Sequence, residues 1–354
     1  MFLAIRELSY SKLKYILVGV ILTAILFLLF FMNGLASGLS NADSSSIKNL
    51  PADYVVMNEA AEGNITKSEI GEGKKQNIYE KIDVNESTPL TITMSSVKGN
   101  GQLTDVVYFA LNTDHNTMPD VIEGKSVNEI SNNEVIVNQS MKNQGYELYD
   151  KLFDENLGVE FEIVGFFENQ TLNHLPVVYT SISHWNEKEL PNSETNNAIL
   201  YYGEQVELEG FDVLTVEETV NAIPGYSETQ GSLLMMITFL FIISAFISTV
   251  FFYVITIQKS NQFGVLKAIG ANTRFIAKGI IIQVILITLI SFGFSLIGIS
   301  GMTQLLPAEM PFEISISLIV WTGLLFLFLN IVGSLLSVYK ISKVDALEAI
   351  GRVD

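Results

Sequence analysis

Four long stretches of this sequence carry no charged residue, and no other feature limits the possible folds as strongly. The stretches are residues 15–42, 229–258, 279–308 and 314–339. A helix of about 20 apolar residues is ~30 Å long, which is the thickness of the hydrocarbon core of a membrane. A helix that is apolar on every side needs lipid or a very large core around it. The sequence therefore predicts four membrane-spanning helices.

The first stretch has a second interpretation. Lys12 and Lys14 precede it and several small residues follow it, as in a secretory signal peptide that is cleaved. Its apolar run is longer than the roughly 7 to 15 residues of such a peptide, which favours a retained membrane anchor. A cleaved signal peptide stays the alternative.

The basic residues outside residues 41–230 indicate an orientation. All ten lie in the N-terminal segment, between the second and third stretches, or in the C-terminal tail, whereas residues 302–313 contain none. Short loops rich in Lys and Arg stay on the cytoplasmic side of a membrane. We therefore expect both termini and residues 258–278 in the cytoplasm, and residues 41–230 and 302–313 outside.

The long segment between the first two stretches is strongly acidic. Residues 41–230 hold 32 of the 38 acidic and 10 of the 20 basic residues, so they carry −22 and the rest of the chain +4. An acidic outer segment argues against nucleic acid as a partner. The absence of cysteine excludes disulfides and thiolate metal sites, which suits the surface of a Gram-positive bacterium.

Short β-prone runs within the acidic segment predict an α+β domain. We expect strands at residues 53–57, 90–94, 106–110, 134–138, 159–166 and 176–180, with a short helix at 139–145.

The segment between the second and third stretches has its own pattern. Phe263, Leu266 and Ile269 are spaced three apart, Gly270 can end a helix, and Asn272 or Thr273 can cap the next one. This pattern predicts a helix at the membrane surface, a turn, and the start of the third span. The first 14 residues also have helical spacing, so they form either an interfacial helix or a charged flank of the first span.

The expected organisation follows from these patterns. It comprises a cytoplasmic interfacial helix at 1–14, span one at 15–40, an extracytoplasmic domain at 41–230, span two at 231–257, a cytoplasmic coupling loop at 258–278, span three at 279–301, an extracytoplasmic loop at 302–313, span four at 314–339 and a cytoplasmic tail at 340–354.

Two motifs resemble a known family. The string QFGVLKAIGA at residues 262–271 and the tail at 343–350 resemble the first inner loop and the closing motif of ABC-transporter permeases of the FtsX/MacB type. Gly145, Asp150 to Leu152 and residues 161–166 are similar to the core of the MacB-like domain, although Tyr149 stands where that domain usually has Gly. The basic residue usual after the tail's leucine is also replaced here.

The resemblance implies a fold and partners. The fold is an α-helical membrane protein with four transmembrane helices and an α+β extracytoplasmic MacB-like domain inserted between spans one and two. The implied partners are an ABC ATPase subunit, a second permease copy in a homodimer, and membrane lipids. The ATPase would couple to the inner loop at Phe263, Gly264, Leu266, Lys267, Ile269 and Gly270.

The chain lacks the phosphate-binding loop G-x-x-x-x-G-K-[ST] anywhere in its sequence. We therefore expect it not to be an enzyme, and we expect ATP hydrolysis in a separate subunit. No intrinsic cofactor is indicated. His115, His174 and His184 are separated by polar segments, which does not favour a metal site.

Residues 10–17 and 33–39 look like the haem-exporting permeases of this family, which suggests haem as the transported substrate. Met32 lies ~27 Å along a helix from Lys14, and Glu228 with Tyr226 lies at a similar expected depth. Thioether, carboxylate and phenol oxygen can all approach haem iron. The plain alternative is that Met32 only packs and Glu228 only marks the wet start of a helix.

Two other functions stay open. One is an FtsX-like regulator whose outer domain activates a cell-wall hydrolase. The other is a permease for lipoproteins, peptides or drugs. In each case we expect a multi-pass protein of the cell membrane, and the lack of cysteine favours a Gram-positive bacterium.

Overall fold

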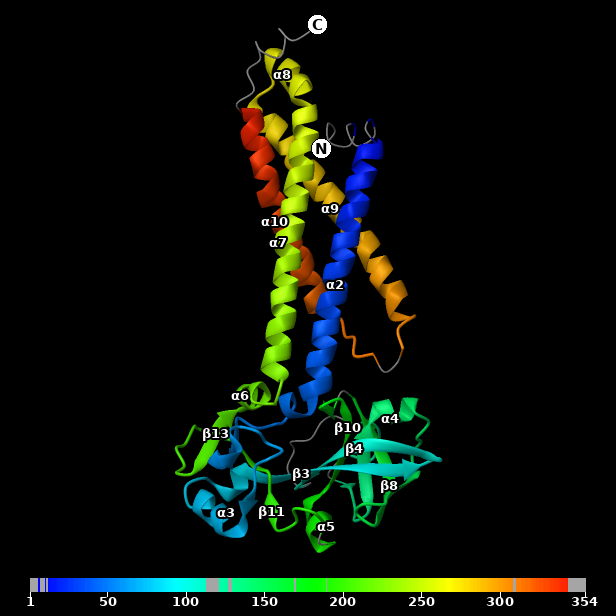
Figure 1. The fold of residues 1–354 in the computed structure, drawn as a ribbon, viewed down its shortest axis with the longest axis vertical. Helices are drawn as coiled ribbons and strands as arrows, with labels where there is room; N and C mark the ends of the chain where they lie inside the picture. Colours follow the sequence, from blue (N-terminus) through cyan, green and yellow to red (C-terminus); the bar gives the residue numbers. More distant parts are fainter. Residues whose placement is uncertain are drawn as a thin grey trace. The chain divides into compact units, whose positions relative to one another are not determined.

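The chain forms two compact units, a membrane unit of residues 1–38 and 231–354 and an inserted domain of residues 39–230. The computed structural model describes residues 6, 10, 12–112, 121–126, 129–168, 170–188, 190–307 and 310–342. Four helices in these parts of the chain are long and apolar enough to cross a membrane. The α+β domain comes between the first and second of them (Figure 1), which confirms the predicted fold class.

From residue 12 onward, the described residues of the membrane unit form five helices. They are α2 (Lys12–Lys48), α7 (Tyr226–Gln258), α8 (Ser260–Ala268), α9 (Thr273–Thr303) and α10 (Ile316–Ser342). With 37 and 33 residues, α2 and α7 are longer than the ~20 residues that a membrane requires, and both continue into the inserted domain. Where the bilayer begins and ends along each helix stays a prediction.

The core of the membrane unit follows the helical period of α2. Tyr15, Val18, Leu22, Leu26 and Leu29 are buried at intervals of three or four residues, so they share one face of the helix. They pack in one cluster with buried residues of α7, α8, α9 and α10: Phe252, Phe263, Ile276, Ile280, Val284, Ile287, Ile299 and Phe326. Residues on the other faces, such as Ile16 and Val20, are exposed, as expected of side chains that contact lipid.

The inserted domain contains one large mixed sheet with the strand order β13-β1-β12-β3-β4-β10-β6-β8-β5. These strands are β13 (Phe211–Thr215), β1 (Tyr54–Asn58), β12 (Ala198–Tyr201), β3 (Ser87–Gly99), β4 (Gln102–Leu111), β10 (Leu175–Ser181), β6 (Glu134–Asn138), β8 (Val159–Phe167) and β5 (Val121–Gly124). Off this path, β7 (Lys151–Asp154) pairs with β3 and β8, and β9 (Thr171–Leu172) pairs with β10. A small separate sheet joins β2 (Ile70–Gly71) and β11 (Thr195–Asn196).

Both faces of this sheet are covered. Along β4, Val107 and Phe109 belong to one buried cluster while Val106 and Tyr108 belong to another, because successive side chains of a strand point to opposite faces. The short helices of the domain are α3 (Glu72–Tyr79), α4 (Gln139–Asn143), α5 (Ile182–Glu187) and α6 (Val216–Asn221), with 3₁₀ turns at Glu59–Ala61 and Val84–Glu86. Burial on both faces explains why the strands read as nearly continuous apolar runs.

The ends of α2 and α7 are part of the domain's own core. Ile47 of α2 and Leu50 just after it are buried in the cluster that also contains Val107 and Phe109 of β4. Tyr226, the first residue of α7, belongs to the same cluster. The domain therefore holds both helices by packed side chains as well as by the chain itself.

The strands expected from sequence are all present. The expected helix at 139–145 is also observed, as α4 over Gln139–Asn143. The structure adds elements that the sequence did not indicate, among them β5, β7, β12, β13 and α3. Of the expected interfacial helix at 1–14, residues 1–5, 7–9 and 11 lie outside the described residues, as does the tail motif at 343–350.

Candidate functional site

Three polar side chains contact one another at the end of the membrane unit that contains α8. Lys259, which precedes α8, donates a hydrogen bond to the Tyr15 hydroxyl over 2.7 Å, and Tyr15 donates to Gln283 Oε1 over 3.0 Å. The Lys259 ammonium also lies 4.9 Å from the centre of the Tyr15 ring, within cation–π range. We call these three residues the Tyr15 junction. It connects the start of α8 with α2 and α9.

The residues predicted to couple to an ATPase fall into two groups. Phe263 and Gly264 are buried in the membrane unit, and Leu266 packs against the same core. Ile269 is 76% exposed and Gly270 is exposed, while Lys267 is half-buried. Phe263 thus anchors α8 to the spans, and the apolar surface left for another protein contains Ile269 and the exposed Val265.

The turn after α8 has the geometry that the sequence predicted. Gly270 has φ +99°, a left-handed conformation that glycine adopts at little cost. The amides of Gly270 and Ala271 donate to the carbonyls of Lys267 and Leu266, which closes the helix end. Asn272 then caps α9 by accepting a hydrogen bond from the amide of Arg274 over 3.1 Å. These bonds set the path of the chain from α8 into α9.

A second group of polar contacts lies in the inserted domain, where α2 and α7 meet. The hydroxyls of Ser40 and Tyr226 are 2.8 Å apart and share a hydrogen bond. Lys48 donates to Ser40 Oγ over 2.6 Å and lies 5.6 Å from the centre of the Tyr226 ring. We call Ser40, Lys48 and Tyr226 the Tyr226 junction. It ties the end of α2 to the first residue of α7.

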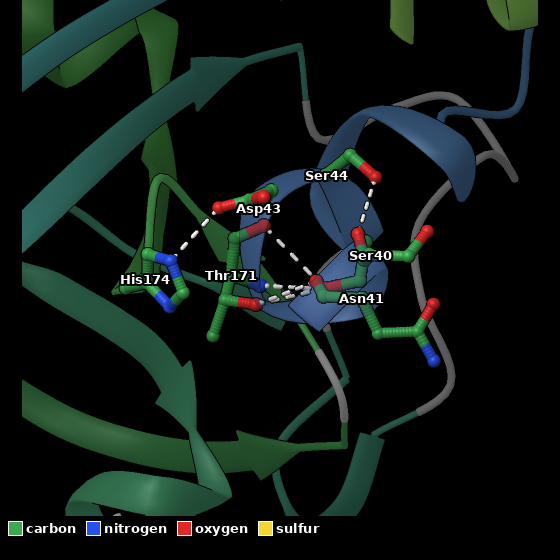
Figure 2. A network of polar contacts seen from close by, with 7 residues as sticks. Ser40, Asn41, Asp43, Ser44, Thr171 and His174 are labelled. Carbon is green, nitrogen blue, oxygen red and sulfur yellow. Dashed lines mark hydrogen bonds and ion pairs between the residues drawn. The ribbon is translucent and has the colours of Figure 1, made fainter. Parts of the chain in front are cut away.

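The β-hairpin formed by β9 and β10 is hydrogen-bonded to the same part of α2 (Figure 2). The two-residue turn between β9 and β10 is Asn173-His174, and both residues have positive φ, 50° and 66°, as in a type I′ turn. Their amides donate to the carbonyls of Asp43 and Ala42, and His174 Nε2 lies 2.9 Å from Asp43 Oδ1. Beside the turn, Thr171 Oγ1 donates to the carbonyl of Asn41 over 3.0 Å.

Ser45 completes this attachment of α2 to the hairpin. Its hydroxyl accepts a hydrogen bond from the amide of Thr171 over 2.9 Å and lies 3.0 Å from Thr171 Oγ1. These are several directional bonds to one short stretch of α2, so movement of α2 along its axis would have to move the hairpin or break them.

The three residues predicted to contact haem occupy different surroundings. Met32 is half-buried on α2 in the membrane unit. Tyr226 and Glu228 share the first turn of α7 in the inserted domain, where Glu228 is exposed. Tyr226 is 8% exposed and its hydroxyl is already bonded to Ser40. Whether any of them contacts haem stays a prediction.

Two glycines near Met32 meet the segment before α10. A Cβ on Gly38 would lie 2.3 Å from the carbonyl oxygen of Pro311, and one on Gly34 would lie 2.5 Å from the Phe312 ring. The Gly34 carbonyl accepts a hydrogen bond from the amide of Glu313 over 3.0 Å. Gly34 and Gly38 therefore form a surface against which residues 311–313 pack.

The histidines do not form a cluster among the described residues, which contain no group of three or more His, Cys, Asp or Glu able to hold a metal ion. His115 lies outside the described residues. His184 is buried, and burial lowers its pKa, with Lys188 acting in the same direction and Glu187 in the opposite one. His184 therefore prefers the neutral form in the folded domain.

Sequence reasoning missed the Tyr15 and Ser40 contacts. Tyr15 and Lys259 are 244 positions apart, and Tyr15 and Gln283 are 268 apart, so no local pattern joins them. One signal was available. Gln283 is an amide inside an otherwise apolar stretch, and polar residues in a predicted span usually face a partner inside the protein.

Residues 234–346 match the family described as FtsX-like permease C-terminal. The chain thus contains an FtsX-like permease domain, and four helices in its described residues are long and apolar enough to cross a membrane. The resemblance to FtsX-like permeases that the inner-loop motif indicated is confirmed.

Particular relatives match over almost the whole chain. A protein of Staphylococcus epidermidis, described as the proposed permease protein HrtB of a hemin transport system, is 29% identical over 358 residues, 99% of each chain. A Staphylococcus haemolyticus protein with the same description is 27% identical over 361 residues, again 99% of each.

Two solved structures overlap about half of the chain. The periplasmic region of MacB from Actinobacillus actinomycetemcomitans has 10% identity and a TM-score of 0.35, and covers 48% of this chain and 92% of its own. The extracellular domain of the ABC-type transporter YknZ from Gram-positive bacteria has 12% identity and a TM-score of 0.34, and covers 46% and 99%.

Proposed function

We propose that this chain is the permease subunit of an ABC transporter that exports an amphiphile from the outer leaflet of the membrane. Haem is the first candidate for this amphiphile. The observation that carries the proposal is the Tyr15 junction, which attaches the loop helix α8 to α2 and α9. The full-length similarity to relatives described by hemin transport supports haem as the substrate.

The energy would come from a separate ABC ATPase. Its binding surface on this chain would include the exposed apolar residues Val265 and Ile269 of the α8 region. Two permeases and two ATPases would assemble, and ATP-driven closure of the ATPases would move the paired α8 helices. The Tyr15 junction would pass this movement to α2 and α9. Lys259, next to α8, donates to Tyr15 of α2, and Tyr15 donates to Gln283 of α9.

The movement would reach the inserted domain through its attachments to α2 and α7. Ser40 and Tyr226 tie the two helices to each other, and the hairpin at Thr171–His174 holds α2 by several hydrogen bonds. A mechanism of this kind needs no substrate passage through the inner leaflet, since force and not cargo crosses the membrane. A cargo site near the outer leaflet is sufficient.

Met32 and Glu228 are the proposed contacts for haem. The thioether of Met32 and the carboxylate of Glu228 are able to ligate iron or contact the porphyrin edge. Tyr226 is the weaker candidate of the three, because its hydroxyl would have to leave Ser40 before it could bind iron. The proposed location is the cell membrane of a Gram-positive bacterium, with both termini and residues 258–278 in the cytoplasm.

Growth on graded haem tests the proposal in a strain that lacks the gene. We expect the deletion to reduce haem tolerance, and wild-type protein to restore it. Met32→Ala and Glu228→Ala should restore several-fold less tolerance at equal membrane abundance. Met236→Ala is the matched control, because Met236 is an exposed methionine of α7 outside the proposed site.

Two outcomes would overturn parts of this proposal. Unchanged haem tolerance in the deletion strain would remove haem as the substrate. Loss of cell-wall hydrolase activity in that strain, with normal haem tolerance, would instead support the FtsX-like regulator.

A further inference from the structure

An apolar cavity of about 780 Å³ lies between α2 and α9. Pockets of ~300–1,000 Å³ are the usual size for small-molecule ligands. Both helices contribute from within the membrane unit, so the cavity belongs to one compact body. The lining residues on α2 lie between positions 12 and 27, and those on α9 between 287 and 298. We call this cavity the α2/α9 groove.

The wall of the groove offers almost no hydrogen-bonding group to a ligand. Ser291 Oγ donates to the carbonyl of Gly19 over 3.0 Å, and Thr23 Oγ1 donates to the same carbonyl over 2.7 Å. Ser295 Oγ donates to the carbonyl of Phe292, and the Tyr15 hydroxyl donates to Gln283. Every hydroxyl of the wall therefore uses its hydrogen within the protein. An occupant of the groove must present hydrocarbon.

One end of the groove is different because Lys12 lines it. Among the lining residues that the structure describes, Lys12 alone is charged, and it is exposed at the end of α2 that lies toward α8. Two other ammonium groups belong to the same end of the unit. Lys14 donates to Gln258 Oε1 over 2.6 Å, and Lys259 donates to Tyr15. Their positive charge adds to that of Lys12 and favours an anion beside it.

The length of the groove matches one leaflet of a bilayer. Lys12 and Phe27 are 15 positions apart on one helix, which corresponds to a rise of ~22 Å. A bilayer with its headgroups is ~40–45 Å thick, so one leaflet with its headgroup spans roughly 20–22 Å. A single lipid could therefore extend from the charged end of the groove to its apolar end.

We propose that the α2/α9 groove is a binding site for an anionic phospholipid of the leaflet nearest α8. An acyl chain lies along the apolar wall, and the phosphate of the headgroup contacts Lys12. In the orientation proposed above, this is the cytoplasmic leaflet. A helix of a second copy of this chain could cover the apolar wall, but it would not place an anion beside Lys12. We therefore assign the groove to an anionic lipid.

Lipid binding to the purified full-length chain in detergent tests the proposal. The probes are phosphatidylglycerol and phosphatidylcholine with identical acyl chains, titrated while bound lipid is counted by native mass spectrometry. We expect phosphatidylglycerol to bind about fivefold more tightly, as one lysine near an anionic headgroup predicts. Lys12→Gln should remove most of this difference, whereas Lys14→Gln, whose side chain is outside the lining, should reduce it much less.

A second variant tests the apolar wall. Ala24 is an exposed lining residue of α2, so Ala24→Phe should fill part of the groove and weaken binding of both lipids several-fold. Val250→Phe is the control, because Val250 is also exposed but lies on α7 outside the groove. Equal thermal stability of the two variants shows that the comparison concerns the groove and not folding.

Three results would overturn the proposal. The first is equal affinity for the two lipids in the wild-type chain. The second is a changed oligomeric state in Ala24→Phe with lipid binding unaltered, which would assign the groove to a second copy. The third is that haem displaces bound phosphatidylglycerol at a lower concentration than added phosphatidylglycerol does. This result would assign the groove to the cargo.

Discussion

His184 is a buried imidazole for which the described structure provides no hydrogen-bond partner at either ring nitrogen. It packs edge-on against Phe161, with the ring centres 6.0 Å apart. Burial lowers its pKa below the ordinary value of 6.5, so the folded domain disfavours the protonated form. The unfolded chain has no such restriction. Below about pH 6.5 the unfolded state binds more protons than the folded state, and the free energy of unfolding falls as pH falls.

We therefore predict that the inserted domain loses stability between pH 7.5 and pH 5.5, and that His184→Leu reduces this loss. Trp185 lies next to His184 in the buried cluster, so its fluorescence reports the unfolding of this region. The measurement is the thermal midpoint at both pH values in a Trp321→Phe background, which removes the other tryptophan. For a domain of this size, each 1 kcal/mol corresponds to a shift of ~2–4 °C.

His174→Gln is the comparison for this experiment. The side chain of His174 is 53% exposed, whereas His184 is buried. The His174→Gln variant should keep most of the pH dependence of the thermal midpoint. If His184→Leu and the wild-type chain lost the same stability between the two pH values, the unpaired imidazole would not be its source.

At the scale of elements, α2 depends on glycines where another segment lies against it. Gly38 has the backbone of Pro311 so close that even a methyl group would lie 2.3 Å from a carbonyl oxygen. Backbone moves less readily than the end of a side chain, which distinguishes this contact from that of Gly34 with the Phe312 ring. The segment before α10 is thus held against α2 by shape.

We predict that Gly38→Ala destabilises the membrane unit by about 1–3 kcal/mol, the usual cost of overpacking. The expected result is a lower thermal midpoint of the purified chain in detergent. Gly301→Ala is the matched control, because Gly301 lies in a helix of the same unit with nothing within 4 Å of the added Cβ. Alanine there should be neutral or stabilising by up to ~1 kcal/mol. Equal midpoints for the two variants would contradict the close contact at Gly38.

The elements were predictable from sequence to the extent that their signals are local. Charge-free length indicated the four long helices, and β-prone runs indicated six strands, because both properties depend on neighbouring residues. The order of the strands was not predictable. β10 pairs in parallel with β4, and β6 in parallel with β8, through contacts between distant parts of the chain. Strands such as β13 lack a strong apolar pattern, since their residues are only half-buried.

The candidate site shows the same limit. The turn at Gly270 and the cap at Asn272 were predictable, because a glycine and an asparagine at these positions act on their own helix ends. The division of the loop residues into buried Phe263 and exposed Ile269 was not, since it depends on how α8 packs against α2 and α9. The partners of Tyr15 come from two other elements and carry no local signal.

At the scale of the whole molecule, α2 and α7 each take part in polar contacts near both of their ends. In the membrane unit, Lys14 of α2 donates to Gln258 of α7, and Tyr15 joins Lys259 and Gln283. In the inserted domain, Ser40 of α2 bonds to Tyr226 of α7. Each helix is therefore fixed to its neighbours in both units. The transmission of movement proposed above depends on these attachments.

Transport and ATP hydrolysis can be measured separately in a reconstituted complex with the proposed ATPase subunit. Tyr15→Phe removes the hydroxyl that links Lys259 to Gln283, and Tyr226→Phe removes the one bonded to Ser40. If these bonds transmit movement, each variant should export several-fold less cargo per ATP hydrolysed while ATP hydrolysis continues. Tyr10→Phe and Tyr149→Phe are matched controls, because both tyrosines are well exposed, and they should keep the wild-type ratio. An unchanged ratio in both junction variants would show that force reaches the inserted domain by packing alone, and a loss in Tyr226→Phe only would place the essential link in the inserted domain.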